Sequence, residues 1–127
     1  MSRTVTTINP ATGEALQTDD AAGLDDVLDI LEAVHTAQPG WAALPGEQRA
    51  DHLRAIGARL RKQRDELAAL LAAEMGKPVA EARAEVEKSA TACDYYAENG
   101  PAALAPQNVD TGSQRSWLRP GHREAVL

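Results

Sequence analysis

The sequence predicts a mainly α-helical fold with a small β-hairpin at its start and one short strand near its end. Apolar residues recur at helical spacing in three stretches, near residues 24–37, 47–75 and 79–98. Glycine and proline residues separate these stretches, which is where helices usually end. The segments before and after them contain β-branched residues and turn formers. We therefore expect one unit of three helices flanked by small β elements.

Residues 1–22 predict the β-hairpin and the lead-in to the first helix. Residues 4–8 form a short β-branched run, and residues 15–18 can return as its partner strand. The connection at residues 9–14 reads Asn-Pro-Ala-Thr-Gly-Glu, which are the residue types that a tight turn requires.

Residues 23–100 are expected to hold the three helices. Asp25 and Asp26 fall in the first turn of the first helix, where the helix dipole favours negative charge. That helix should stop before Pro39, and Trp41 should then pack into the corner that leads to the second helix. The apolar stripe of the first helix consists of Leu24, Val27, Leu28, Leu31 and Val34.

The second and third helices are expected to form a long hairpin around which the chain is organised. Leucines that recur every seventh residue predict one unbroken helix over residues 47–75. Gly76 should stop this helix in a left-handed conformation, and Pro78 suits the first turn of the next one. The stripes are Leu53, Ile56, Leu60, Leu67 and Leu70 in the second helix, and Val79, Ala82, Val86, Ala90, Cys93 and Ala97 in the third.

The end of the chain predicts little regular structure. The third helix should end near residues 99–101, because Asn-Gly-Pro stands there. Residues 101–120 are expected to form a loop and a strand, irregular over 102–113 and extended over about 114–119. Residues 121–127 form a polar tail that does not suit a buried parallel strand.

Composition argues against several classes of partner. The chain has 13 basic and 19 acidic residues and a net charge of −6, and its densest basic cluster, residues 59–64, runs into Asp65 and Glu66. We therefore expect no nucleic acid as a partner. No apolar run approaches the ~18–20 residues of a membrane span, and the first residues are polar, so we expect no membrane span and no signal peptide. A cytoplasmic location is the expectation.

Cysteine and histidine do not predict a reactive or metal-binding site. Cys93, the only cysteine, lies in the apolar stripe of the third helix, without a neighbouring base, cation or helix N-terminus to activate its thiol. We interpret it as a buried packing residue. His35, His52 and His122 are scattered and form no pair at the i, i+4 spacing of a helical metal site. We expect them at the surface, with no metal bound.

Two polar motifs also favour a structural interpretation. Gly76 and Lys77 lack the second glycine and the Ser or Thr of a phosphate-binding loop, so we interpret them as a helix stop with Lys77 near the last carbonyl groups. Four carboxylates lie opposite the apolar stripes and beside basic residues, which is typical of a solvated charged face rather than of catalytic pairs. These carboxylates are Asp65, Glu66, Glu81 and Glu85.

Several short segments together carry a family resemblance. They are residues 9–14, Trp41 with Glu47-Gln48-Arg49-Ala50, Glu74-Met75-Gly76-Lys77-Pro78, Glu81-Ala82-Arg83, Glu85-Val86 and Tyr95-Tyr96-Ala97. In this order they resemble the N-terminal segment of NAD(P)-dependent aldehyde dehydrogenases, most of all the succinate-semialdehyde dehydrogenase branch. The resemblance covers about residues 8–119 and fails in the last eight residues, where the family continues with an apolar strand and a Pro-Trp-Asn motif.

The resemblance implies the N-terminal part of an α/β, Rossmann-like fold that is truncated before the nucleotide-binding sheet, so residues 1–127 would be a single partial domain. It implies an intact enzyme that oxidises an aldehyde, with succinate semialdehyde as the substrate, using NAD or NADP. In the family, a cysteine thiolate attacks the aldehyde and a glutamate activates the water that hydrolyses the thioester. None of these catalytic positions, and none that contacts the nucleotide, falls on a residue of this chain. We therefore assign no catalytic, cofactor-binding or metal site, and expect no activity and no cofactor bound by this chain alone.

Two hypotheses about function remain. In the first, the chain is a piece of an aldehyde dehydrogenase and works only within a complete enzyme. In the second, it is a non-catalytic α-helical interaction module that pairs with an intact aldehyde dehydrogenase subunit. In both cases the helices have apolar faces that need covering, while their alanine-rich stripes bury little area. We expect the isolated chain to be helical but loosely packed, and to associate with itself.

Overall fold

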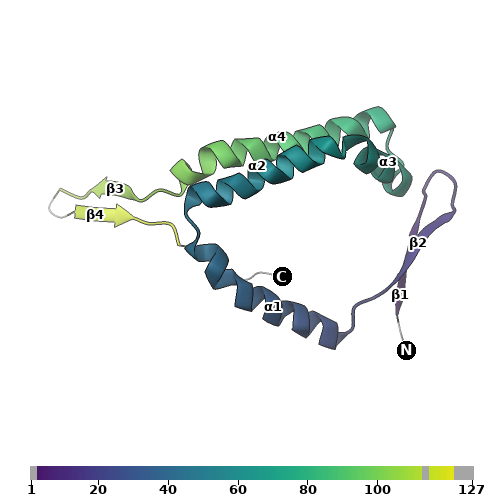
Figure 1. Cartoon of the computed structure of the whole chain (residues 1–127), viewed down its shortest axis with the longest axis horizontal. Coiled ribbons are helices and arrows are strands. Elements are labelled where there is room, and N and C mark those ends of the chain that lie inside the picture. The colour runs from purple at the N-terminus through teal and green to yellow at the C-terminus, as the bar shows by residue number, and fades with distance from the viewer. Residues whose placement is uncertain (1–2, 113–114, 122–127) are drawn as a thin grey trace.

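The computed structural model describes residues 3–112 and 115–121, in which four helices lie between two β-hairpins (Figure 1). This confirms the prediction of a mainly helical fold with a hairpin at its start and a strand near its end. The elements are β1 (Thr4–Ile8), β2 (Ala15–Asp20), α1 (Leu24–Ala43), α2 (Gly46–Lys62), α3 (Arg64–Met75), α4 (Val79–Ala103), β3 (Gln107–Asp110) and β4 (Arg115–Leu118).

The core of the described residues lies where α2 and α3 pack along α4 (Figure 1). Its buried positions are all small or medium in size: Ala50, Gly57, Ala68, Ala82, Val86, Ala90 and Ala97. The two longest helices of this group, α2 and α4, lie close together at Gly57. A Cβ atom at that position would lie 3.2 Å from the carbonyl oxygen of Ala90 and 3.3 Å from Cβ of Cys93. Small side chains therefore allow α2 and α4 to lie close together.

Helix α1 and the two β-hairpins bury none of their residues. Figure 1 shows α1 on the far side of an open arrangement from α2 and α4, and the β3–β4 hairpin projecting away from the helices. The predicted stripe of α1 exists, but three of its side chains are exposed, with Leu24 at 74%, and Val27 and Leu31 are only half-buried. The three expected helices therefore do not share one core in the described part of the chain.

The predicted unbroken helix over residues 47–75 is wrong, because Gln63 separates α2 from α3. Gln63 has φ −100° and ψ 13°, while its N–H still bonds to the carbonyl oxygen of Arg59 at 3.0 Å. The last turn of α2 is basic and the first turn of α3 is acidic, with Asp65 and Glu66. Helix dipoles favour this charge order where one helix ends and another begins. The turn redirects α3 so that both helices contact α4.

Three predicted boundaries near proline residues are also corrected. Helix α1 continues through Pro39 to Ala43, and α4 continues through Pro101 to Ala103. A proline in a helix removes one N–H donor, and the carbonyl group that loses this donor can bind water on an exposed helix such as α1. Residues 102–113 are not irregular throughout, because β3 pairs antiparallel with β4. The start of the expected strand, Gln114, lies outside the described residues.

The β1–β2 hairpin is antiparallel, with Thr6 opposite Thr18, as predicted. Its turn is held by the Asn9 side chain, whose Oδ1 accepts a hydrogen bond from the N–H of Ala11 at 2.9 Å. The turn reaches the joint between α3 and α4. A Cβ atom on Gly76 would lie 3.0 Å from Cγ of Pro10. This contact connects the hairpin to the helices. No helix in the described ranges is both long and apolar enough to cross a membrane.

Candidate functional site

The reactive candidates from the sequence that fall on described residues lie on three different helices. Cys93 packs against α2 beside Gly57, but it is half-buried rather than fully buried as expected. His35 is exposed on α1, and His122 lies outside the described residues. His52 is exposed on α2, where its ring lies against that of Trp41 with 5.3 Å between centroids. Among the described residues, no group of three His, Cys, Asp or Glu side chains could hold a metal ion.

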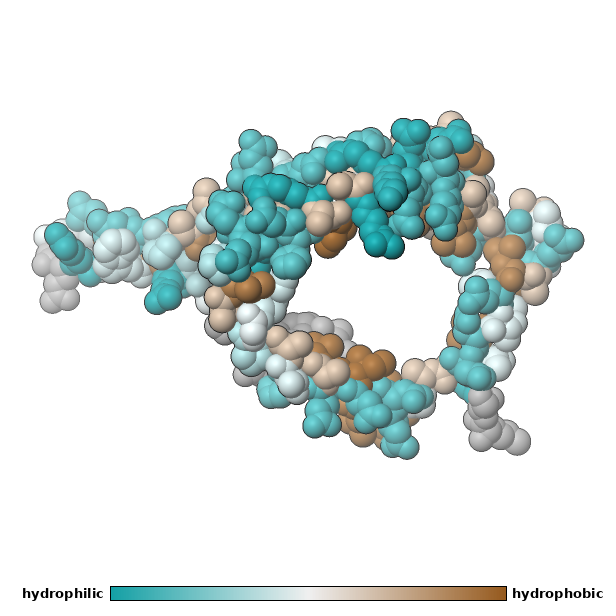
Figure 2. Space-filling view, in the orientation of Figure 1, coloured by the Kyte–Doolittle hydropathy of each residue, from teal (hydrophilic) through white to brown (hydrophobic). Residues whose placement is uncertain are grey.

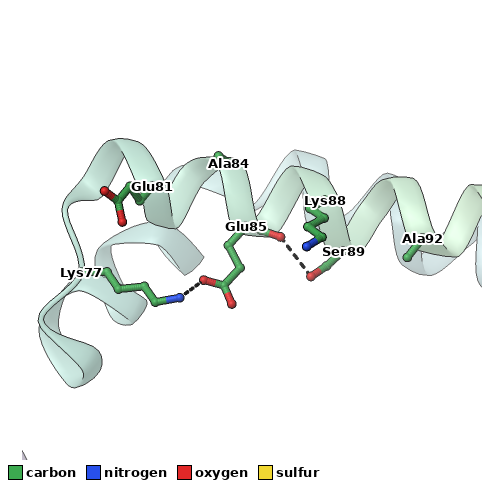
Figure 3. A pocket seen from close by; sticks show the side chains of 7 residues that line it. All are labelled: Lys77, Glu81, Ala84, Glu85, Lys88, Ser89 and Ala92. Atoms are coloured by element: carbon green, nitrogen blue, oxygen red, sulfur yellow. Dashed lines mark hydrogen bonds and ion pairs between the residues drawn. The ribbon is translucent and has the colours of Figure 1, made fainter.

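Gly76 ends α3 in the left-handed conformation that the sequence predicted, with φ 67°. The expectation for Lys77 is corrected. Its ammonium group pairs with the carboxylate of Glu85, in the second turn of α4, rather than with the last carbonyl groups of α3. Lys77 lies just before the start of α4, and its side chain extends along that helix toward Glu85 (Figure 3).

The pair between Lys77 and Glu85 lies in an open pocket of about 610 Å³ on α4, which Glu81 and Lys88 also line (Figure 3). Ser89 lines it too, but its hydroxyl donates to the backbone oxygen of Glu85 at 3.0 Å. Acidic and basic side chains balance each other here, so the surface has no uncompensated charge to attract a charged ligand. We interpret this pocket as part of the solvated face that the sequence predicted for Glu81 and Glu85.

Asp65 and Glu66 are also exposed, at the start of α3. Arg83 of α4 donates from Nε to the Asp65 carboxylate at 2.8 Å. This hydrogen bond, with the charge of Arg83 and of the neighbouring Arg64, holds the pKa of Asp65 below its usual value. Asp65 therefore stays ionised at neutral pH, and its role is to connect α3 to α4 rather than to donate a proton.

A second charged cluster, which the sequence analysis missed, joins α2 to α4. Arg61 donates from Nε to Glu87 at 2.8 Å and from Nη2 to Asp94 at 2.7 Å. The hydrogen bonds to Asp94 and then to Glu87 raise the pKa of Arg61 above its usual value. Glu87 and Asp94 are seven residues apart and so lie on one face of α4. That spacing was visible in the sequence, but the partner on α2 was not.

An apolar pocket lies at the end of the α2–α4 pair, next to the last turn of α1. It has a volume of about 320 Å³, and Trp41, Leu53, Ile56, Tyr96 and Leu104 contribute to its lining. Trp41 is 48% exposed and Tyr96 is 61% exposed, so Trp41 does not close the corner as the sequence predicted. Large aromatic side chains are on average well buried in a folded domain, and a patch of exposed ones often marks an interaction surface.

Exposed apolar side chains extend beyond this pocket. Figure 2 shows them along α1 and along the side of the helices that borders the open middle of the molecule. Those with more than two fifths of their surface exposed on the helices include Leu24, Leu28, Ile30, Val34, Ile56, Leu70 and Met75. The candidate functional feature of this chain is therefore a set of uncovered apolar faces, which is typical of a surface that receives another part of a protein.

Comparison with known proteins supports this interpretation. A family model described as "Aldehyde dehydrogenase family" matches residues 1–121. The chain is 47% identical over 111 residues to the succinate semialdehyde dehydrogenase [NAD(P)+] of Escherichia coli (strain K12), covering 87% of this chain and 24% of that protein. It is 38% identical over 114 residues to the probable succinate-semialdehyde dehydrogenase [NADP(+)] of Synechocystis sp., covering 90% of this chain and 25% of that protein.

Solved structures give the same result for the fold. The succinic semialdehyde dehydrogenase from Streptococcus pyogenes, in complex with NADP+, superimposes with a TM-score of 0.83 at 32% identity. The match covers 88% of this chain and 25% of that one. The open arrangement of helices and hairpins is thus one that occurs in complete enzymes. The chain spans about a quarter of the length of the curated relatives that it matches.

Proposed function

Because the chain belongs to the aldehyde dehydrogenase family, we propose that it serves as the N-terminal structural segment of an enzyme that oxidises succinate semialdehyde to succinate with NAD or NADP. The segment contributes no catalytic residue. Its role is to present the apolar faces of its helices to the rest of such an enzyme, which covers them. The names of its relatives support this substrate and these cofactors. We also propose a cytoplasmic location.

The observation that carries this proposal is the contrast in size between covered and uncovered side chains. Buried positions hold alanine, glycine and one valine, while isoleucine, leucine and tyrosine side chains lie exposed on the same helices. A helix face of this kind gains stability only when another layer covers it. Relatives that are about four times as long, and superimpose closely on this chain, contain further polypeptide that could form that layer.

The proposal is tested by combining this chain with a partner that lacks the equivalent segment. The Escherichia coli relative would be produced without its matched segment and mixed with the 127-residue chain. We expect reduction of NADP dependent on succinate semialdehyde only when both parts are present. The mixture tests whether the segment completes an enzyme of this family, because the preference among aldehydes in the mixture is set by the Escherichia coli part.

The matched control is the same mixture with Ile56→Asp, which places a charge in the apolar pocket and leaves the buried side of α2 unchanged. This variant should not restore activity. Stable binding of the chain to the complete Escherichia coli enzyme, without any restored activity in the mixture, would instead favour the interaction module. Oxidation of the aldehyde by the 127-residue chain alone would contradict the proposal.

A further inference from the structure

Two arginine side chains that form no ion pair within the described residues line a pocket beside the apolar one. The pocket has a volume of about 340 Å³ and lies where the last turn of α1, the first turns of α2, the end of α4 and the segment after β4 come together. Arg49 of α2 and Arg119 of that last segment line it, with Leu104 and Pro106. It adjoins the apolar pocket, since Arg49 and Leu104 line both.

The evidence for a ligand comes from the side chain of Arg49. Its Nε atom is buried, and no hydrogen-bond acceptor reaches it in the described part of the chain. A buried donor without a partner is destabilising, and more so when it is charged, so such atoms are rare in folded proteins. Within the described ranges, neither Arg49 nor Arg119 forms an ion pair.

Other arginines of the chain show that carboxylates are available to pair with. Arg54, Arg61 and Arg83 each bind an acidic side chain at 2.7–2.8 Å. The protein has 19 acidic residues against 13 basic ones, yet none of the described residues that line this pocket is acidic. Two positive charges at one place in an acidic protein leave a local charge that an anion would neutralise.

The chemistry of the lining selects among anions. A guanidinium group offers a planar fork of N–H donors that matches the two oxygens of a carboxylate. Leu104, Pro106 and Ala42 add an apolar wall, which suits the carbon atoms of an organic acid. We propose that the Arg49–Arg119 pocket is a binding site for a carboxylate group. This proposal does not depend on the proposed function.

The site can be tested on the 127-residue chain by NMR of its 15N-labelled arginine side chains. Sodium acetate and sodium succinate would each be titrated against sodium chloride at equal ionic strength, which removes general screening effects. We expect saturable shifts of the Nε–Hε signals of Arg49 and Arg119. The signal of Arg59, an exposed arginine on α2 whose Nε donates to the side chain of Gln63, serves as the internal control and should stay in place.

Two substitutions sharpen the test without removing charge. Arg49→Lys and Arg119→Lys keep a cation but lose the fork of donors, so each should weaken carboxylate binding by roughly tenfold. Arg59→Lys is the matched control and should leave binding unchanged. Circular dichroism checks that each variant folds. If a variant does not fold, the titration of the unsubstituted chain still decides the proposal.

The source of the carboxylate follows from the two probes. Equal binding of acetate and succinate indicates recognition of a single carboxylate, as an Asp or Glu side chain of another polypeptide segment presents it. Succinate binding that is about tenfold tighter indicates a free dicarboxylic acid. Shifts that chloride reproduces, shifts of equal size at Arg59, or no saturable shift at Arg49 would each overturn the proposal.

Discussion

The α2–α4 pair and helix α1 are both amphipathic, but only the first buries its apolar side. In the α2–α4 pair, alanines and Gly57 allow close approach, and the ion pairs of Arg61 with Glu87 and Asp94 add contacts at the surface. In α1, apolar side chains at the same helical spacing remain exposed. Hydrophobic periodicity therefore predicts a helix, but it does not say whether the partner of that helix is present in the same 127 residues.

The largest effect is expected from a substitution that forces α2 and α4 apart. Gly57→Leu places side-chain atoms where Cys93, Asp94 and the carbonyl group of Ala90 already lie within 3.3 Å of a Cβ atom. We expect a loss of about 2–3 kcal/mol in the free energy of unfolding, because overpacked cores must shift to accommodate added atoms. Urea denaturation followed by circular dichroism at 222 nm measures this change.

Gly40→Leu is the matched control on α1, since no atom lies within 4 Å of the added Cβ position. It should not lower stability, because leucine is the better helix former by roughly 1 kcal/mol. Equal destabilisation by both substitutions would show that α1 is packed as tightly as α2.

A smaller effect is expected from the charged cluster that joins the two helices. Arg61→Gln removes the ion pairs with Glu87 and Asp94, which are partly exposed. The melting temperature should fall slightly, and the difference from the unsubstituted chain should shrink in high salt, because salt screens exposed charges. Arg59→Gln, which removes no ion pair, should have no comparable salt dependence. A loss that salt leaves unchanged would contradict an electrostatic origin.

The pair between Asp65 and Arg83 predicts a dependence on pH. Arg83 lowers the pKa of Asp65 in the folded state from its ordinary value of 3.8, so the stabilisation is present above that pH and is lost as the pH falls through the lowered value. The unsubstituted chain should therefore melt at a higher temperature than Arg83→Gln at pH 7. Thermal melting between pH 7 and acidic pH should show the two curves converging below the ordinary pKa. A difference that persists in acid would exclude this cause.

The smallest effect is expected on α1. Leu28→Ala removes a side chain that is 53% exposed, so the free energy of unfolding should change by less than about 0.5 kcal/mol. Val86→Ala, at a position that is 5% exposed on α4, should cost about 1–2 kcal/mol by the same urea measurement. Leu28→Ala should nevertheless reduce binding of a hydrophobic dye. Similar losses at both positions would contradict the contrast between the helices.

The sequence predicted those elements whose cause is local. The left-handed Gly76, the turn at Asn9 and Gly13 and the helical stripes of α1 and α4 all follow from residues within a few positions of one another. The break at Gln63 also had a local signal, since basic residues precede it and Asp65 and Glu66 follow. That charge order was interpreted only as a mixed surface.

Features that depend on distant residues were not predictable from pattern alone. Prolines 39 and 101 suggested helix ends, yet both helices continue past them by a few residues. The pairing of β3 with β4 and the ion pairs of Arg61 require two segments to meet in space. The pocket that Arg49 and Arg119 line brings together residues 70 positions apart, and neither residue alone predicts it.

The central claim is that, among the described residues, α2, α3 and α4 form a packed core while other apolar faces need a partner. Hydrogen exchange tests it most directly. Amide exchange of the isolated chain would be followed residue by residue at a concentration where it is monomeric. We predict slow exchange in α2 and α4 near Gly57 and Ala90, and much faster exchange in α1, because its hydrogen bonds are not covered by packing. Protection of α1 in the monomer equal to that of α4 would contradict the account.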